Sequence, residues 1–534
     1  MSLLGHFRQS DFADQITLLT RIQSDKLLEA IPDLFDLYRQ PLGDTMIDHL
    51  VITSLQALLA DHEEETVRRI QQGDRREKAI CINIAGIRRF ASAVPVLHSL
   101  LSDEAFKELH SDIFSALGKI GSPESLGLFR QYIHHPDEIP ASLAIQMVGQ
   151  YRDEDSIEAL VGFIEQAQKA EGYETCSLKI GMAVEALGAI HTDQSISCLV
   201  SRIHHRNATI RRIIHDELIK IGPDAVAFLA KVFDGGNTDG KILAANILGM
   251  IGAKPGGEVL VRALDAGKAD DPNVRYAIYE AFGRIQFLKG LTCLIDALEI
   301  DDELILTAVL TALSNQINPG VIKKLKEVLG NGGAHSDKIL RALVAVKAVD
   351  LFHHLYADEK IAAAVMMEIT RTGDPDVFDA FKSALAMIEG DRARADLAKL
   401  SAIALTLGGR EVLAADDSRA MLSFYRSVAP DLGIKITTAE NGKDALELIK
   451  KGRSFALIIT DMNMPVMDGL EMTRKIRREV GNTKIPIIMV TTESEQAQQD
   501  MARSAGVDAF ITKPFTAAVL KAKLTAFLSE ESRL

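Results

Sequence analysis

Acidic, hydroxyl and lysine side chains follow short apolar runs in the last quarter of the chain. Asp416 and Asp417 follow one run, Asp461 ends the run LIIT, and Thr491 and Lys513 end two later runs. The carboxyl ends of parallel strands meet at one sheet edge, so we expect these five side chains to lie together. Two acids that hold Mg²⁺, an acid nucleophile, a hydroxyl and an ammonium group form a constellation suited to phosphoryl transfer.

The elements that must position these residues are short strands alternating with amphipathic helices. The pattern predicts a right-handed, doubly wound parallel sheet of five strands. The predicted strands are 411–416, 434–439, 456–461, 486–490 and 509–512. The predicted helices are 418–429, 442–451, 468–479, 493–504 and 515–529.

Residues 411–534 resemble the receiver domain of two-component response regulators, and their motifs are most similar to the single-domain chemotaxis type. The motifs that carry the resemblance are Asp416-Asp417, Asp461-x-Asn463-x-Pro465, Asp468-Gly469, Thr491 and Lys513-Pro514. The resemblance implies a (βα)5 fold in which Asp461 accepts a phosphoryl group from a sensor histidine kinase or a phosphotransfer protein.

The same resemblance implies a Mg²⁺ ion held by Asp416, Asp417, Asp461 and the backbone carbonyl of Asn463. It further implies that Thr491 and Lys513 contact the incoming phosphoryl group. Such a domain catalyses only its own phosphorylation and slow dephosphorylation, so we expect no turnover of an external substrate.

Three further positions follow from the resemblance. Phe510 occupies the aromatic switch position, where the chemotaxis type has Tyr, so ring rotation is retained without a hydroxyl hydrogen bond. Met462 replaces an aromatic neighbour of the phosphoacceptor, which predicts different packing there. Asn463 and Glu493 are expected to flank the path of the water that hydrolyses the acyl phosphate.

The preceding sequence, from about residue 10 to 408, is a succession of amphipathic helices that repeats itself. Equivalent positions recur every 30 to 39 residues, with a period near 31, which is typical of stacked helical hairpins. These positions are Gly118, Gly149, Gly188, Ile219, Gly249, Gly283 and Ser314.

One repeat shows the expected hairpin. The first helix has an apolar face and ends at Gly121, and Ser122 and Pro123 are the predicted cap and first residue of the second helix. The apolar faces are formed by Ile113, Leu117 and Ile120, and by Leu126, Phe129 and Ile133. Residues 26–390 resemble short HEAT repeats of the phycobilin-lyase type, which implies an all-α solenoid.

The chain is therefore expected to be multidomain. We predict an irregular helical cap with early repeats at 1–75, HEAT-like repeats at 76–390, a final helix and glycine linker at 391–410, and the receiver at 411–534. Gly408 and Gly409 should end the last helix before the first strand.

Charge and composition limit the possible partners. The formal net charge is −14, and residues 411–534 carry 17 acidic and 17 basic residues, so the excess negative charge lies in the first 410 residues. With no Trp and few aromatic residues, nucleic acid is a disfavoured partner. Neither a signal peptide nor a long apolar run occurs, so we expect a cytoplasmic protein that does not insert into membranes.

The function of the helical repeats is open to three interpretations. The favoured one is a scaffold whose concave surface binds an unidentified protein partner, with access set by receiver phosphorylation. The alternative is a metal- or chromophore-dependent HEAT-repeat enzyme regulated by the receiver, for which the candidates are His62-Glu63 and the doublets His134-His135, His204-His205 and His353-His354.

The third interpretation is nucleic-acid binding by arginine clusters. One cluster contains Arg68, Arg69, Arg75, Arg76 and Lys78, and another contains Arg206, Arg211 and Arg212. Because acidic residues stand nearby, solvated mixed-charge faces are expected instead. The four cysteines lie far apart, and we expect reduced, buried thiols.

Overall fold

The chain, described here by a computed structural model, forms two compact units. The first contains the described residues up to Ser195 and the second begins at Ile196. The structure describes residues 4–169, 178–205, 207–402, 410–464, 466–478, 485–491, 496–513 and 515–530. Within these ranges, every helix is too short or too polar to cross a lipid bilayer.

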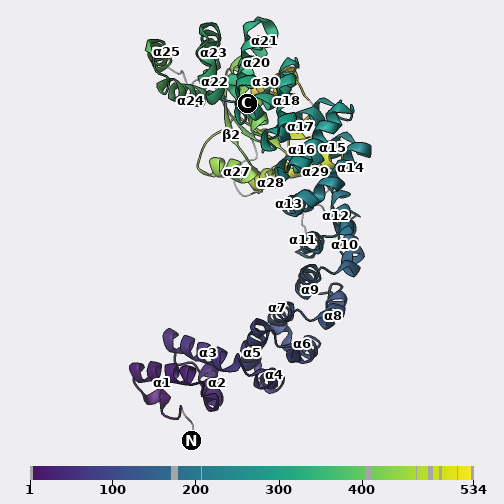
Figure 1. Cartoon of the computed structure of the whole chain (residues 1–534), viewed down its shortest axis with the longest axis vertical. Coiled ribbons are helices and arrows are strands. Elements are labelled where there is room, and N and C mark those ends of the chain that lie inside the picture. The colour runs from purple at the N-terminus through teal and green to yellow at the C-terminus, as the bar shows by residue number, and fades with distance from the viewer. Residues whose placement is uncertain are drawn as a thin grey trace. The chain divides into compact units, whose positions relative to one another are not determined.

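The first unit consists of consecutive helical hairpins, which Figure 1 colours from purple to blue. Its helices are α1 (Phe12–Ser24), α2 (Ile31–Arg39), α3 (Thr45–Leu59), α4 (Glu63–Gln72), α5 (Arg75–Arg88), α6 (Val94–Leu101), α7 (His110–Ile120), α8 (Leu126–Tyr132), α9 (Glu138–Gln150), α10 (Ile157–Lys169) and α11 (Leu178–Ile190). Short 3₁₀ segments precede several of them: η1 (Phe7–Gln9), η2 (Leu28–Ala30), η3 (Ala91–Ala93), η4 (Glu104–Leu109), η5 (Pro123–Ser125) and η6 (Glu154–Ser156).

Helical hairpins continue through most of the second unit. Its helices before the sheet, with α12 spanning the boundary, are α12 (Asp193–Val200), α13 (Ala208–Ile221), α14 (Val226–Gly235), α15 (Thr238–Ile251), α16 (Lys254–Asp265), α17 (Pro272–Arg284), α18 (Leu288–Asp296), α19 (Glu303–Ser314), α20 (Pro319–Gly330), α21 (Gly333–Ala345), α22 (Val349–Leu355), α23 (Glu359–Thr372), α24 (Pro375–Ala386) and α25 (Asp391–Ala402). The 3₁₀ turns are η7 (Gly222–Ala225) and η8 (Ala297–Glu299). Gly408 and Gly409, the predicted end of the last helix, lie outside the described residues.

The hairpin in residues 110–133 has the predicted break but not the predicted cap. Ile113 and Leu117 are fully buried, and α7 ends at Gly121, whose φ of 74° suits glycine. Ser122 makes no capping hydrogen bond with its side chain, and Pro123 begins the 3₁₀ turn η5 instead of an α-helix. The chain therefore re-enters the helical conformation through a tighter turn than the sequence pattern suggested.

The repeating glycines lie where the first helices of successive hairpins cross. A Cβ atom at Gly249 would lie 2.9 Å from Cβ of Ala281, and one at Gly283 would lie 3.1 Å from Cβ of Ala312. Helices α13, α15, α17, α19, α21 and α23 are these first helices in the second unit, and we call their common surface the A-helix face. Their close stacking buries apolar stripes that one hairpin could not bury alone.

Residues 410–530 form the α/β segment, and its sheet is parallel as predicted. The strand order is β2-β1-β3-β4-β5. The strands are β1 (Arg410–Ala415), β2 (Ile434–Ala439), β3 (Leu457–Asp461), β4 (Ile487–Thr491) and β5 (Ala509–Thr512), and the helices are α26 (Arg419–Leu432), α27 (Gly442–Lys450), α28 (Gly469–Arg478), α29 (Gln496–Ala505) and α30 (Ala517–Glu530).

Helices cover both faces of this sheet. One apolar cluster joins the sheet to α26 and α30, and two others join it to α27, α28 and α29. β3 and β4 are buried along their full length because they lie inside the sheet with helices on both sides. The strand ends that carry the acidic residues consequently share one edge.

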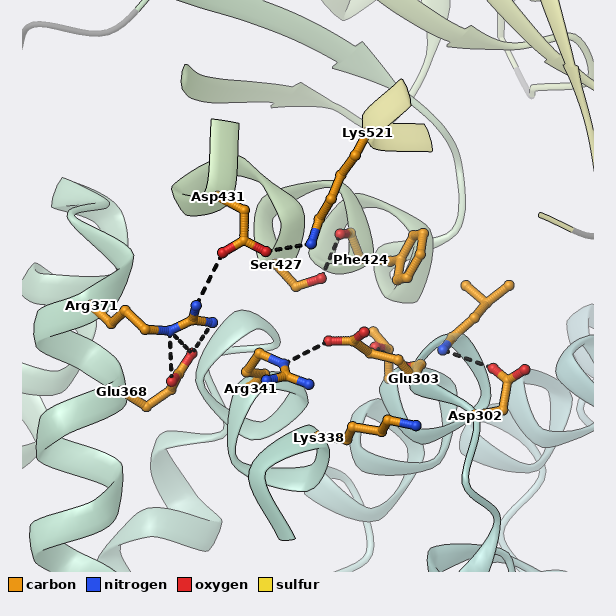
Figure 2. Close-up of polar contacts among 12 residues, drawn as sticks. Asp302, Glu303, Lys338, Arg341, Glu368, Arg371, Phe424, Ser427, Asp431 and Lys521 are labelled. Carbon is orange, nitrogen blue, oxygen red and sulfur yellow. Dashed lines mark hydrogen bonds and ion pairs between the residues drawn. The ribbon is translucent and has the colours of Figure 1, made fainter. Parts of the chain in front are cut away.

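Within the second unit, α26 packs against α19, α21 and α23 on the A-helix face. Asp431 of α26 accepts from Arg371 of α23 at 3.1 Å and pairs with Lys521 of α30 (Figure 2). Leu304 of α19 contacts the apolar cluster that contains Phe424. The helix is therefore buried on two sides, by its own sheet and by the repeats. Ser423 and Ser427, one turn apart, are nearly buried as a result.

Candidate phosphoryl-transfer site

Asp416, Asp461 and Lys513 meet at the carboxyl edge of the sheet. The Lys513 ammonium group lies 2.8 Å from Asp461 Oδ1 and 3.4 Å from Asp416 Oδ2. Asp416 is fully buried and also accepts from the backbone N–H of Ser418 at 3.0 Å and from the Tyr425 hydroxyl at 3.3 Å. Asp461 is 7% exposed, so it is the carboxylate of this pair that can be reached.

Burial and mutual repulsion shift the protonation of these groups. Burial raises the pKa of Asp416 to about 7, with Lys513 opposing that shift and Asp461 adding to it. Asp417 lines the cavity at this edge, where protein surrounds it. Lost hydration, followed by repulsion from Asp416, raises the pKa of Asp417 as well. Burial alone would lower the pKa of Lys513, but Asp416 and Asp461 together raise it, so the ammonium stays charged.

The predicted metal ligands are of a suitable type but are not gathered. In the described parts of the chain, no three His, Cys, Asp or Glu side chains are grouped closely enough to hold a metal ion. All three aspartates line one cavity, but only Asp416 and Asp461 pair with Lys513. Hard carboxylate oxygens with a surplus of negative charge fit Mg²⁺, which uses few protein ligands and keeps several waters. Side-chain rotation is needed to assemble the site.

The other predicted site residues lie around Asp461. Thr491 ends β4, is buried, and donates its hydroxyl to the Met462 sulfur at 3.7 Å. Met462 therefore accepts a hydrogen bond from a predicted site residue. The Asn463 backbone N–H donates to Asp461 Oδ2 at 2.9 Å, which fixes the loop carrying the predicted carbonyl ligand. Glu493 and Pro514 lie outside the described residues.

Phe510 is partly buried at β5. Its ring packs against the cluster formed by Met462, Leu470 and Met489, and the Arg503 guanidinium lies 5.8 Å from the ring centroid. All of these neighbours belong to the α/β segment. The contacts with the repeats are made instead at α26 and at the loops beside Asp461, where the sequence analysis placed no contact.

A cavity of about 200 Å³ separates Asp461 from the A-helix face. Its walls combine the sheet edge with residues from α13, α15 and α17. The Tyr276 hydroxyl lies 2.6 Å from Ser418 Oγ, and the Arg212 guanidinium donates to the Val466 carbonyl at 2.8 Å. Arg211 donates to the Asn463 side chain. Three hydrogen bonds therefore attach the repeats to the two loops beside Asp461.

These contacts change the interpretation of one arginine cluster. Arg211 was expected on a solvated mixed-charge face, but only 2% of it is exposed, and it contacts the loop after β3. The presence of adjacent arginines was visible in the sequence, but their target was not. In the other cluster, Arg68 is exposed and pairs with Glu65, as expected for a mixed-charge surface. Arg69 is only 17% exposed and pairs with both Glu65 and the buried Glu77.

The remaining candidates are not brought together into a site. His353 and His354 are exposed with their ring planes at 84°, and His205 is buried beside the exposed His204. The described histidines therefore give no support to a metal-dependent enzyme. Cys81 is a buried free thiol as predicted, whereas Cys198 and Cys293 are only partly buried, and Cys176 lies outside the described residues.

Comparisons with known proteins match the α/β segment. The model of the family described as "Response regulator receiver domain" matches residues 412–525. A chemotaxis protein CheY homolog of Campylobacter jejuni is 42% identical over 123 residues, covering 23% of this chain and 95% of the relative. Chemotaxis protein CheY1 of Helicobacter pylori is 40% identical over 119 residues, covering 22% of this chain and 96% of the relative.

Solved structures match the same segment. The receiver domain of the sensor histidine kinase PA1611 from Pseudomonas aeruginosa, solved with magnesium coordinated in its active site cleft, is 26% identical and covers 23% of this chain and 99% of its own, with a TM-score of 0.22. Chemotaxis protein CheY4 of Vibrio cholerae is 32% identical. The match covers 22% of this chain and 99% of CheY4, with a TM-score of 0.22. Through its C-terminal segment, the chain belongs to the family of two-component response regulator receivers.

Proposed function

We propose that Asp461 accepts a phosphoryl group from a histidine kinase or phosphotransfer protein, and that its phosphorylation controls a protein interaction of the helical repeats. The observation that carries the first part is the 2.8 Å contact between Lys513 and the reachable carboxylate of Asp461 at the sheet edge. An ammonium group in that place neutralises charge that develops on a phosphoryl group.

In the proposed reaction, Asp461 Oδ1 attacks phosphorus in line with the phosphorus–nitrogen bond of a phosphohistidine. That bond breaks, an aspartyl phosphate forms, and the imidazole nitrogen keeps the electron pair and takes up a proton. Lys513 and Thr491 hold the transferred oxygens, and Asn463 N–H orients Asp461. Mg²⁺ held by Asp416, Asp417, Asp461 and the Asn463 carbonyl would supply further neutralisation of the phosphoryl charge.

The second part of the proposal rests on the packing of α26. Because α26 lies on α19, α21 and α23, a protein can use this stretch of the A-helix face only after α26 has moved away. Phosphorylation beside the docked loops is well placed to shift that equilibrium. We expect the receiver to catalyse only its own phosphorylation and dephosphorylation.

Intact-mass measurement tests the phosphoacceptor. Full-length protein treated with acetyl phosphate and Mg²⁺ should gain about 80 Da, the mass of one phosphoryl group. Asp461→Asn or removal of Mg²⁺ with EDTA should abolish the gain, and the exposed acid variant Asp444→Asn should retain it. An unchanged gain in Asp461→Asn would disprove the assignment.

Affinity capture tests the scaffold. Full-length protein is used as bait with and without beryllium fluoride and Mg²⁺, and Asp461→Asn serves as the unresponsive control. A partner whose recovery changes only with the wild-type bait supports the proposal. Equal recovery of every partner in both conditions contradicts the regulatory part.

A further inference from the structure

Arg211 is a buried cation that reaches from the repeats to the phosphoacceptor loop. Its guanidinium donates to the carbonyl of His205 at 2.8 Å and to the side chain of Asn463. The first contact fixes the guanidinium on its own helix hairpin, and the second places it on the α/β segment. Nothing in the reaction proposed above uses this side chain.

The path from Arg211 to Asp461 is short. Asn463, which accepts from Arg211, also donates its backbone N–H to Asp461 Oδ2. Arg212 holds the same loop through the carbonyl of Val466. Both arginines line the cavity into which Asp461 opens. The two guanidinium groups therefore border the space that a phosphoryl group on Asp461 would enter.

Most of the cationic side chains that line the cavity come from the repeats. Six carboxylates and four cationic side chains line it, and three of those four cations, Arg211, Arg212 and Arg284, come from α13 and α17. The guanidinium group presents a planar fork of donors that matches phosphate oxygens. A transferred phosphoryl group would thus find more positive charge on the repeats than on the receiver itself.

The cavity also has room for the group. Its volume is about 200 Å³, whereas a water molecule occupies about 30 Å³ of liquid volume. A tetrahedral phosphoryl group of four heavy atoms therefore fits without displacing α13 or α17.

From this arrangement we propose that Arg211, assisted by Arg212, is a phosphoryl-binding residue that helix α13 supplies to the receiver, so that phosphorylation strengthens the docking of the receiver on the A-helix face. The inference rests on the proposed function of Asp461. Because coupling between binding events is reciprocal, docking also increases the affinity of the site for a phosphoryl group.

Beryllium fluoride, which mimics the phosphoryl group on an aspartate, tests the inference in the full-length protein. Fluorine NMR at fixed Mg²⁺ measures its affinity for wild type, Arg211→Gln, Arg211→Lys and Arg212→Gln. One charge-assisted hydrogen bond corresponds to roughly tenfold or more in affinity, so Arg211→Gln should bind at least about tenfold more weakly. Arg211→Lys should recover part of the loss, and Arg212→Gln should show a smaller loss.

Arg371→Gln is the matched control, because it removes an interface arginine remote from the cavity. Its pair with Asp431 is partly exposed and therefore weak, so the affinity for beryllium fluoride should stay within a few-fold of wild type. Hydrogen exchange provides the second measurement. The anion should increase protection of α13 and α26 in wild type, with a smaller increase in Arg211→Gln.

The outcomes separate the two proposals. Equal affinity in wild type and Arg211→Gln, or a loss of protection in α26 when the anion binds, overturns the role of Arg211 while leaving Asp461 as the phosphoacceptor. The partly exposed Arg212 provides the same comparison if Arg211→Gln fails to fold. Wild-type protein that binds no beryllium fluoride and gains no mass with acetyl phosphate disproves the proposed function itself.

Discussion

At the scale of single residues, His215 in the cavity wall is a neutral histidine among cations. Burial, followed by repulsion from Arg211 and His204, lowers its pKa to about 4, while the carbonyl of Ile203 accepts from its ring at 3.2 Å and opposes the shift. The imidazole is therefore neutral at neutral pH, because a positive charge at this position would be buried and would repel Arg211.

This shift predicts that His215 makes a contribution to the stability of the second unit that is lost in mild acid. A pKa lower in the folded than in the unfolded state means that the unfolded chain binds more protons, so this contribution is present above about pH 6.5 and is lost as pH falls towards 4. The raised pKa of Asp416 acts in the opposite direction over the same range, so the contribution of His215 is the difference between wild type and His215→Gln, with a slope of up to about 1.4 kcal/mol per pH unit. Thermal unfolding of both proteins, followed by circular dichroism between pH 7 and 4, measures this difference, and an equal pH dependence in the two would contradict the assignment.

At the scale of elements, the contact of α26 with the repeats contains an unfavourable charge. Lys347, between α21 and α22, has a lowered pKa because it is desolvated and lies near Arg426. It also adopts a positive φ of 53°, which Asn tolerates better than Lys. Lys347 therefore weakens the contact between α26 and the repeats.

Lys347→Asn should therefore stabilise the docked second unit by about 1 kcal/mol, since it removes a desolvated charge and relieves backbone strain. Differential scanning calorimetry of the full-length protein measures the effect. The control is Lys338→Asn in α21. Because Lys338 forms an ion pair with Asp301, its replacement should be neutral or destabilising. Destabilisation by Lys347→Asn would show that the lysine makes a favourable contact.

The helix crossings provide a second prediction at this scale. Gly249→Ala should destabilise the second unit by roughly 1–3 kcal/mol, because the added methyl group meets Ala281 at 2.9 Å. Gly162→Ala in α10 is the control, since nothing lies within 4 Å of the added atom and alanine favours the helix by up to about 1 kcal/mol. Chemical denaturation of each variant measures both effects. Equal changes would show that the crossing does not depend on the absence of a side chain.

At the scale of the second unit, the docked repeats cover the loops that a protein donor must reach. Tyr276 contacts Ser418 after β1, and Arg212 contacts Val466 after β3. A cavity of about 200 Å³ is large enough for a small phosphodonor but too small for a helix. Under the proposed function, phosphotransfer from a protein donor therefore requires the receiver to leave the A-helix face.

Weakening this contact should accelerate phosphotransfer from proteins selectively. The double variant Tyr276→Phe with Arg371→Gln should accept phosphoryl groups from a phosphohistidine protein several-fold faster, because more molecules are undocked, and from acetyl phosphate at a similar rate. Rates from gels that resolve the phosphorylated chain give the comparison. Equal acceleration with both donors would show that docking does not discriminate between them by size.

Local sequence determined most of the receiver. The apolar runs placed all five strands, and the residues after them placed Asp416, Asp461, Thr491 and Lys513 at one edge, because the carboxyl ends of parallel strands must coincide there. The helical nature of the repeats and the break at Gly121 also followed from residues close together in the chain. Each of these features depends on interactions between sequence neighbours or within one small sheet.

The contact between Arg211 and Asn463 joins residues 252 positions apart, and no local pattern specifies it. Which repeats face α26 depends on small rotations accumulated over successive hairpins. Those rotations are set by packing at crossings such as Gly249 against Ala281. The sequence by itself determined a receiver-type sheet edge that carries Asp461 and a stack of helices. Only the tertiary structure decided that the stack covers Asp461, because the packing angles add up over many hairpins and no single residue encodes their sum.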